Sequence, residues 1–340
     1  MKNGIKAELT RREFLTWAGL FCAAFSVPTM GVSEVAKALE SGLAMHPVLW
    51  IQGGSCSGCS VSLLNCVDPD IKKILLDPVV PSHQLSVQFH QTIMAAEGDV
   101  AISALREGHK KNKGKYVLVV EGNIATADHG AYCDFGLKDG KPVSMVEWTE
   151  TLARDAMAVI ALGSCAAYGG IPSGAPNPTE GMGVIDFLKD KKIKTPVINI
   201  PGCPTHPDWL VLAIAHVLVK GLPKASDLDE KSRMKQFFGE TVHDRCPRLK
   251  YFEEGVFAEK FGDEGCLVML GCKGPMAMAD CPTRKWNNGV SFCIDAGAPC
   301  LACVEPGFPD ESGPFYGAIS EETMIRLGIR PAGREVKRNA

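Results

Sequence analysis

Cysteines are the residues of this chain whose number and spacing could do chemistry, because 14 of them occur among 340 residues. Four follow apolar runs: Cys56 and Cys59 share one loop, Cys165 ends Gly-Ser-Cys, and Cys203 lies in Pro-Gly-Cys-Pro. If those runs are parallel strands, their carboxyl ends face one crevice, where ligands bind. We therefore expect these four thiols to hold one iron–sulfur cluster, with a zinc ion or a redox thiol pair as the alternatives.

A second group of candidate ligands contains a histidine. It combines His243 and Cys246 with Cys266 and Cys272. One imidazole and three thiolates form a suitable ligand set for a cluster, and zinc accepts the same set equally well. In the alternative interpretation His243 only caps a turn.

A third group consists of Cys281, Cys293, Cys300 and Cys303. Iron–sulfur clusters are held by four cysteines at such spacings, and paired disulfides are the alternative. Three cysteines remain, of which Cys66 and Cys133 are interpreted as structural and Cys22 lies in the N-terminal leader described below.

The first group needs a parallel sheet to bring it together. Four short apolar runs predict buried parallel strands, at residues 47–52, 116–121, 156–162 and 196–200. Helical patterns lie between or after them, at residues 70–76, 143–154, 184–191 and 207–219. Strands that alternate with helices indicate a doubly wound α/β domain.

Two features support a cluster beside the first strand. A helix expected to begin at Ser60 would direct its N–H groups toward an anionic ligand at Cys59. Gly53 and Gly54 let the backbone approach that ligand, whereas a phosphate-binding loop is excluded because no Lys-Ser/Thr pair follows.

Composition changes after residue 220. Residues 222–227 are typical of a linker, and beyond them Gly, Pro and Cys dominate while periodicity fades. We expect a domain at residues 39–222 and a second, irregular domain at residues 223–340. The second domain would be held largely by bound metal.

The N-terminus predicts export. Arg11 and Arg12 precede a modestly apolar stretch, and Ala36-Lys37-Ala38 offers a cleavage pattern. Twin arginines are typical of the Tat route, which carries folded cargo, so residues 1–38 are a predicted signal peptide and the mature chain is expected in the periplasm. The apolar stretch is too short to be a membrane anchor, and no later segment approaches membrane-spanning length.

Charge excludes one class of partner. The net charge is −3, and no basic stripe interleaved with aromatic residues is present. A nucleic-acid-binding function is therefore not expected.

The motifs together resemble a known family, the small subunit of nickel–iron hydrogenases. The resemblance rests on the combined sequences at residues 58–65, 120–122, 163–170, 201–204 and 270–275, together with the twin-arginine leader. It implies a flavodoxin-like first domain and a heterodimer with a large subunit that carries the nickel–iron site. This chain would then contain no catalytic residue of its own, and would relay electrons to an external carrier such as a multihaem cytochrome c.

The resemblance also implies which residues hold which cluster. The proximal 4Fe–4S cluster would be held by Cys56, Cys59, Cys165 and Cys203. The distal 4Fe–4S cluster would be held by His243, Cys246, Cys266 and Cys272. The medial cluster would be held by Cys281, Cys293, Cys300 and Cys303. We further hypothesise that His243 places the distal cluster near the surface where the carrier docks.

Several positions depart from the common pattern of that family. Many members have proline where Cys293 stands, and their medial cluster is 3Fe–4S; a fourth thiolate here predicts 4Fe–4S. Cys293, with residues 284–289 and 303–306, looks like the nickel–iron–selenium branch. Gly58 and Gly170 replace two cysteines of oxygen-tolerant members, which predicts an ordinary proximal cluster. Ser55 stands where many members have a glutamate with a suggested proton-relay role, so that role cannot be carried over.

Two other functions fit parts of the pattern. A cluster-bearing subunit related to the quinone-reducing respiratory complex would share the strand-end cysteines, but it would lack the ligands at residues 243–303. A secreted binding domain stapled by disulfides is the third interpretation. Glu121 and Asp128 are interpreted as hydrogen-bonding residues near a subunit interface. Tethering to a membrane through another subunit stays open.

Overall fold

The structure is a computed structural model that describes residues 44–80, 83–317, 320 and 322. The predicted signal peptide, residues 1–38, and Cys22 lie outside the described residues.

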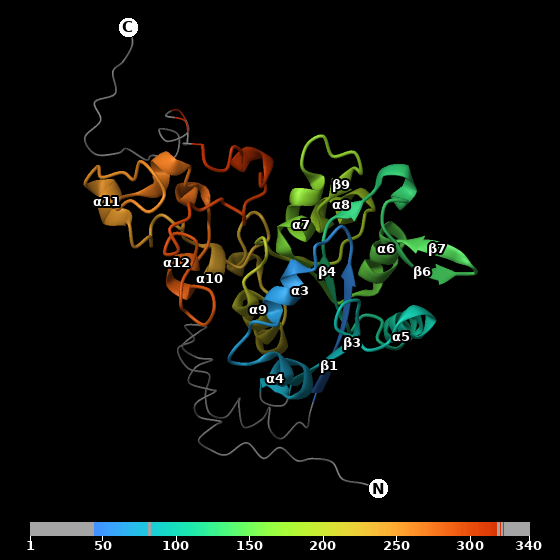
Figure 1. Cartoon of the computed structure of the whole chain (residues 1–340). Helices are drawn as coiled ribbons and strands as arrows, with labels where there is room; N and C mark the ends of the chain where they lie inside the picture. The colour runs from blue at the N-terminus through green and yellow to red at the C-terminus, as the bar shows by residue number, and fades with distance from the viewer. Residues whose placement is uncertain (1–43, 81–82, 318–319, 321, 323–340) are drawn as a thin grey trace, which may run out of the picture.

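A six-stranded sheet forms the centre of the molecule (Figure 1). Its order is β10-β8-β4-β1-β3-β2, in which the first five strands are mutually parallel and β2 is antiparallel to β3. The strands are β1 (Ala44–Gln52), β2 (Pro78–Val80), β3 (His83–His90), β4 (Val117–Glu121), β8 (Ala158–Leu162) and β10 (Val197–Ile200).

Four neighbouring strands end level with one another. Gln52 pairs with Glu121, Glu121 with Leu162, and Leu162 with Ile200. These are the last residues of β1, β4, β8 and β10. The loops that follow the four strands therefore leave the sheet at the same edge.

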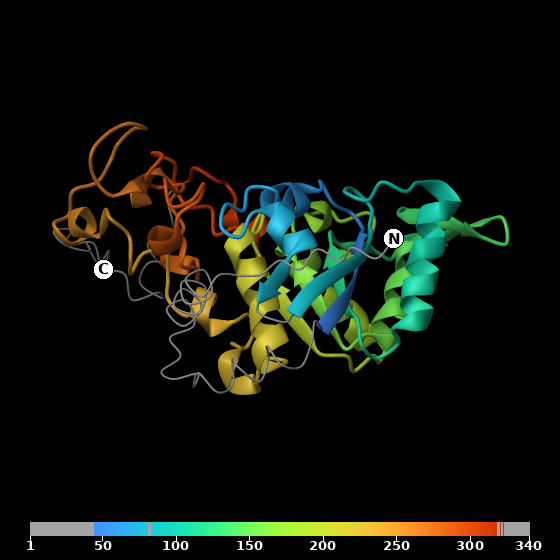
Figure 2. The same cartoon turned by 90° about the horizontal axis from the view of Figure 1, so that it is seen from below.

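Helices cover both faces of the sheet, as Figure 2 shows from below. One face packs against α3 (Gly58–Leu63), α4 (Ile71–Leu76) and α9 (Pro207–Lys220). The other face packs against α5 (Gly98–Lys111), α6 (Met145–Asp155) and α8 (Val184–Asp190). Because both faces are covered, the central strands are largely apolar, and all five residues of β8 are buried.

The four predicted strands and the four predicted helices are confirmed, with ends that shift by a few residues. The helix predicted from residue 143 begins at Met145, because Val143 and Ser144 belong to β7. Ser144 caps this helix by accepting a hydrogen bond from the Glu147 N–H at 3.1 Å. The helix expected from Ser60 begins two residues earlier, so Cys59 lies in its first turn.

The sequence patterns missed β3 and α5. The sequence of β3 is His-Gln-Leu-Ser-Val-Gln-Phe-His, and only Leu85, Phe89 and His90 are buried. This strand lies one position from the sheet edge, so it needs no continuous apolar run and resembles a half-exposed segment.

The loops between the strands of the central sheet contain further short elements. They are β5 (Ile124–Ala125) with β9 (Gly181–Met182), the hairpin of β6 (Asp134–Lys138) and β7 (Lys141–Ser144), η1 (Ala127–Gly130), α7 (Gly163–Tyr168) and η2 (Ile171–Ser173).

The C-terminal part forms a lobe beside α3 and α9 in both views (Figures 1 and 2). It is irregular, as predicted, because its elements are short. They are η3 (Ala225–Asp227), α10 (Lys235–Phe238), α11 (Leu249–Glu253), η4 (Leu267–Leu270), η5 (Gly274–Met276), α12 (Cys281–Arg284) and η6 (Asp310–Ser312).

Apolar packing joins this lobe to the sheet. The ring of Trp209 in α9 packs at a tilt of 59° against Phe238 with centroids 4.9 Å apart, and its indole N–H donates to Asp280 Oδ1 at 2.7 Å. His206 accepts the Asp208 N–H at Nδ1, so its Nε2–H donates to the Lys285 carbonyl at 2.8 Å. Side chains from the lobe and from α9 belong to one apolar core, which therefore contributes to holding the lobe in place.

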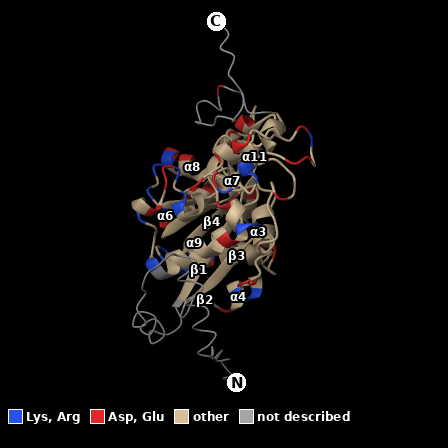
Figure 3. Ribbon diagram, turned by 90° about the vertical axis from the view of Figure 1, so that its left-hand side faces the viewer, with Lys and Arg blue, Asp and Glu red and all other residues tan. Residues whose placement is uncertain are grey.

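Acidic and basic residues are interspersed over the face shown in Figure 3. Within the described part of the chain, no helix has the length and apolar character needed to cross a bilayer.

Candidate iron–sulfur sites

The strand-end cysteines converge at the level edge of the sheet. Cys59 lies in α3, Cys165 in α7, and Cys203 in the loop after β10. Burial, together with the charges of Cys203 and Cys56, raises the pKa of the Cys165 thiol to about 12. The pKa of Cys59 is likewise raised by burial and by Cys165 and Cys203. All four side chains predicted for the proximal site thus lie within electrostatic reach of one another.

Glycines make room for these thiols. A Cβ on Gly163 would lie 2.5 Å from Cys59 Sγ, and one on Gly170 would lie 3.0 Å from Cys165 Sγ. Both glycines have positive φ, 84° and 55°, which side-chain-bearing residues rarely adopt. The two glycines therefore let the backbone pass close to the sulfurs of Cys59 and Cys165.

Glu121, the last residue of β4, organises the loop that carries Cys59. Its carboxylate is 1% exposed and has no cationic partner among the described residues. It accepts hydrogen bonds from the backbone N–H groups of Cys59 and Ser60 at 3.1 and 3.2 Å. Side-chain donors complete the shell, namely Ser60 Oγ at 2.5 Å, Trp50 Nε1 at 3.1 Å, Gln52 Nε2 at 3.0 Å and Ser55 Oγ at 3.4 Å. Hydrogen bonds of this number compensate a buried carboxylate.

His90 extends this network away from the thiols. Its Nδ1 accepts the Thr92 N–H at 3.1 Å, so Nε2 carries the proton and faces Ser60 Oγ at 3.2 Å. Burial lowers the pKa of His90 to about 4, which keeps the imidazole neutral at physiological pH. The chain His90–Ser60–Glu121 therefore has a defined direction of hydrogen bonding.

The second group of ligands lines one enclosed pocket. Its wall includes His243, Cys246, Cys266 and Cys272, together with Arg248 and Ile294. His243 is half-buried, and its ring meets Phe252 edge-on with centroids 4.7 Å apart. The Arg248 N–H donates to Cys246 Sγ at 3.4 Å. The structure thus brings together all four residues predicted for the distal site.

The third group also converges. Burial raises the pKa of Cys281, and the charges of Cys303 and Cys293 add to the effect. The pKa of Cys303 is raised to about 12 by burial, with a further contribution from Cys293. Cys300 interacts with both Cys303 and Cys281. Cys293 is the most exposed of the four, so it occupies the rim.

Direct contacts link the three groups in series. The Cys303 thiol accepts the Cys203 N–H, and Ser164 Oγ, next to Cys165, donates to the Cys303 carbonyl. On the other side of the third group, the Cys300 N–H donates to Cys272 Sγ at 3.3 Å. The order in space is therefore proximal, medial, distal.

The donor set fits iron–sulfur clusters. Within the described ranges no three His, Cys, Asp or Glu side chains come close enough to surround a single metal ion. A zinc ion requires four ligands at about 2.0–2.3 Å from one point, whereas a cluster separates its thiolates by its own width. Backbone N–H groups also donate to several of the sulfurs, an interaction that tunes such clusters. All thirteen described cysteines are free of disulfides.

The two cysteines interpreted as structural lie apart from these groups. Cys66 is buried in the core just after α3, and Cys133 packs against the core on the opposite face of the sheet.

Sequence patterns missed the central position of Glu121, which they indicated only as a hydrogen-bonding acid. A carboxylate that directly ends the apolar run Val-Leu-Val-Val was the available indication.

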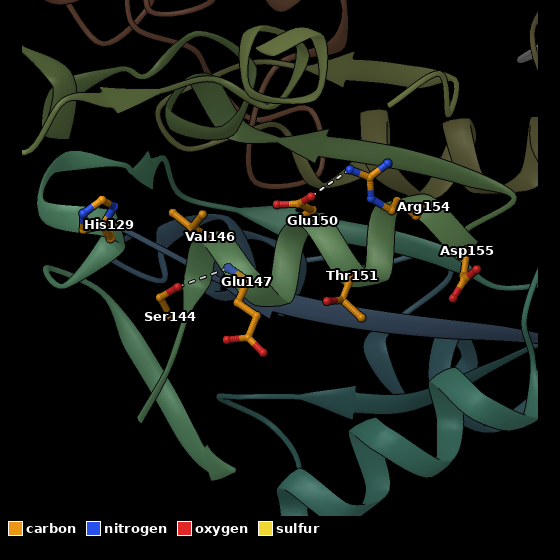
Figure 4. Close-up of a pocket in the computed structure, with 8 residues that line it drawn as sticks. All are labelled: His129, Ser144, Val146, Glu147, Glu150, Thr151, Arg154 and Asp155. Atoms are coloured by element: carbon orange, nitrogen blue, oxygen red, sulfur yellow. Dashed lines mark hydrogen bonds and ion pairs between the residues drawn. The ribbon is translucent and has the colours of Figure 1, made fainter. Parts of the chain in front are cut away.

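A second pocket runs along the solvent side of α6 (Figure 4), with a volume of about 480 Å³. Its lining includes Glu147, Glu150 and Arg154, and the last two form an ion pair at 2.7 Å. It contains none of the candidate ligands. We interpret it as the polar face of an amphipathic helix.

Gly163→Ala tests the geometry of the proximal site. The new Cβ would collide with Cys59 Sγ, so we expect the purified protein to lose about four of about twelve irons. Gly140→Ala is the matched control, because Gly140 also has positive φ, 77°, and a methyl group there would meet nothing within 4 Å. It should keep all its iron, and equal iron in the two variants would contradict the assignment.

Glu121→Gln tests the buried carboxylate. The amide turns two N–H groups toward a shell of donors, and each donor left unpaired costs about 1–3 kcal/mol of unfolding free energy. We expect a decrease of that size in denaturant unfolding. Asp128→Asn is the control, since Asp128 is exposed and accepts only the Tyr132 hydroxyl; it should change stability by less than about 0.5 kcal/mol. Equal effects would show that the shell around Glu121 is not important for stability.

Two family descriptions match the chain. Residues 56–217 match the 20 kDa subunit of NADH ubiquinone oxidoreductase, and residues 238–316 match the C-terminal part of the NiFe/NiFeSe hydrogenase small subunit. The first match spans all four strand-end cysteines, which a subunit of that kind was expected to share. The second covers all of residues 243–303, whose ligands the respiratory subunit was expected to lack.

Relatives match over nearly the whole chain. The periplasmic [NiFeSe] hydrogenase small subunit of Desulfomicrobium baculatum is 43% identical over 319 residues, which is 91% of this chain and 99% of the relative. The periplasmic [NiFe] hydrogenase small subunit of Solidesulfovibrio fructosivorans is 40% identical, over 93% of this chain and 94% of the relative.

Solved structures agree with these relatives. The [NiFeSe] hydrogenase of Dm. baculatum superposes with a TM-score of 0.76 at 44% identity, covering 81% of this chain and 100% of that one. The recombinant [NiFeSe] hydrogenase of Desulfovibrio vulgaris Hildenborough gives a TM-score of 0.76 at 46% identity, over 81% of this chain and 98% of that one. The chain therefore belongs to the family of NiFe/NiFeSe hydrogenase small subunits, and is an oxidoreductase subunit.

Proposed function

We propose that this chain is the electron-transfer small subunit of a periplasmic nickel–iron or nickel–iron–selenium hydrogenase. It would relay electrons between an active site on a large subunit and an external carrier. The observation that carries this proposal is the series of three ligand groups, joined by Cys203 with Cys303 and by Cys300 with Cys272. An electron relay requires such a series, because the distance of each electron transfer between neighbouring clusters must be short.

Twelve residues would hold the three clusters. They are Cys56, Cys59, Cys165 and Cys203 at the proximal site, His243, Cys246, Cys266 and Cys272 at the distal site, and Cys281, Cys293, Cys300 and Cys303 at the medial site. Bound clusters supply reversible one-electron transfer. The chain itself would bind and space them, and its backbone N–H groups donate to the sulfurs of Cys246, Cys272 and Cys303.

We also propose the finer architecture. Numbered along the chain, the five parallel strands have the order 2-1-3-4-5, which is the flavodoxin-like order. The proposed domains are residues 39–222 and 223–340, and metal binding would complement the apolar contacts that hold the second domain.

The proximal end is the proposed docking face for the large subunit. Cys56 is exposed there. Val61 and Leu64, three positions apart on and just after α3, are 53% and 46% exposed, so they lie on one side of the helix. Apolar side chains exposed beside a candidate electron-transfer site favour a protein partner.

The distal end is the proposed contact for the external carrier. His243 is only half-buried, and the exposed Phe261 and Tyr316 meet edge-on in the same lobe, with ring centroids 5.5 Å apart. A multihaem cytochrome c is the proposed class of carrier. Periplasmic location after Tat export is proposed because the relatives named above are periplasmic.

The test of this function is a metal analysis of the chain purified with its native partners. Iron and acid-labile sulfide should be about twelve each per chain, and EPR of the oxidised sample should show no three-iron signal. Cys293→Ser should bring iron to about eleven and produce that signal, because the fourth medial ligand is lost. Zinc in place of iron and sulfide would contradict the electron-relay function.

Val61→Glu tests the docking face. A charge in the middle of an apolar contact should weaken binding of the large subunit at least ten-fold, which corresponds to about 1.4 kcal/mol. The measurement is the amount of each variant that co-purifies with the large subunit as the concentration of the large subunit is increased. Val100→Glu is the control, since Val100 is 70% exposed on α5, on the other face of the sheet. If both variants bind equally well, α3 is not part of the interface.

A further inference from the structure

Three side chains that ordinarily carry a full charge are buried among the described residues: Glu121, Arg233 and Lys273. Glu121 is surrounded by hydrogen-bond donors, as described above. Arg233 forms ion pairs with Asp229 at 2.7 Å and with Glu305 at 2.9 Å. Lys273 is different, because no carboxylate in the described part of the chain lies within ion-pair distance of its ammonium group.

Among the described residues, two carbonyls hold the ammonium group of Lys273. Its Nζ donates to the Gly271 and Gly317 carbonyls, each at 2.9 Å, and the residue is 5% exposed. A Cβ on Gly271 would meet Tyr316 and Gly317 at 2.7–2.8 Å, so the backbone there closes tightly over this site. A buried cation with no counter-charge is costly, and a nearby negative charge would remove that cost.

The backbone places Lys273 between two ligand groups. It follows Cys272 of the distal group directly, and its N–H donates to the Cys300 carbonyl of the medial group at 2.6 Å. Both cysteines become thiolates when they bind metal, so negative charge would develop on both sides of this one cation.

We propose that Lys273 is a positioning residue for electron transfer, whose buried ammonium group raises the reduction potentials of the medial and distal clusters together. This inference rests on the proposed function. An electron that moves from one of these clusters to the other changes the charge of each by one unit and makes or breaks no bond. A fixed cation near both sites stabilises the reduced form of each, because added negative charge is attracted to it. Burial keeps that attraction from being screened by salt.

The test is EPR-monitored redox titration of the assembled enzyme carrying Lys273→Gln. Glutamine removes the charge and keeps N–H donors, on a side chain that is one bond shorter. We expect the medial and distal potentials both to shift to more negative values, while the proximal potential stays unchanged. Lys273→Arg retains the charge and should keep both potentials close to the wild-type values.

Lys250→Gln is the matched control. Lys250 is exposed on α11, whose Phe252 packs on His243, so this substitution removes a solvated charge near the distal site. The cluster potentials of this variant should stay at the wild-type values. Unchanged medial and distal potentials in fully loaded Lys273→Gln would overturn the inference, even if its melting temperature fell, because the lysine would then be purely structural.

Iron content separates the remaining outcomes. If Lys273→Gln fails to load these two sites while Lys273→Arg loads them fully, the positive charge is needed and the inference is supported. If both variants fail, shape rather than charge is required and the inference is wrong. If the wild-type protein itself holds no clusters there, the proposed function fails instead.

Discussion

The register of four parallel strands constrains everything else in this molecule. Gln52, Glu121, Leu162 and Ile200 lie side by side at the ends of β1, β4, β8 and β10. Cys56, Cys165 and Cys203 follow three of these residues by three or four positions. A slip of one residue in any pairing would turn its side chains to the opposite face and move its cysteine out of reach. The apolar core on both faces of the sheet is therefore what sets the geometry of the proximal site.

Buried polar groups fix the loops relative to the aligned ends of the strands. The Glu121 carboxylate accepts hydrogen bonds from the N–H groups of Cys59 and Ser60. The end of β4 therefore determines where the segment that follows β1 lies. Ser164 has a similar role between β8 and β10, because its hydroxyl accepts the Gly202 N–H at 2.9 Å and donates to the Cys303 carbonyl. Few alternative conformations satisfy so many buried donors and acceptors at once.

The C-terminal lobe depends on contacts rather than on regular structure. Trp209, His206 and the core around α9 attach it to the sheet domain, and ion pairs of Arg233 hold Glu305, two residues after Cys303. These contacts bring the medial group against the proximal one. Lys273 then lies between the medial and distal ligand groups, because it follows Cys272 and donates its N–H to the Cys300 carbonyl.

The local features of this protein follow from its sequence alone. Apolar runs and caps predicted four strands and four helices, and the combined motifs identified the hydrogenase small-subunit family, which the relatives confirm. Cysteine spacing also predicted the three ligand groups, and their assignment to clusters stays a prediction. Local patterns could not show β3, because a strand near the sheet edge is only partly buried.

The way in which distant residues meet is set by the tertiary fold. It placed Glu121 beneath the Cys59 loop, joined Cys203 to Cys303 and Cys272 to Cys300, and buried Lys273 away from any described carboxylate. The physical reason is that these contacts join residues far apart in the chain, or depend on what surrounds a side chain after packing. Periodicity and spacing report which residues share a strand or a helix face, but not which loops meet across a sheet edge.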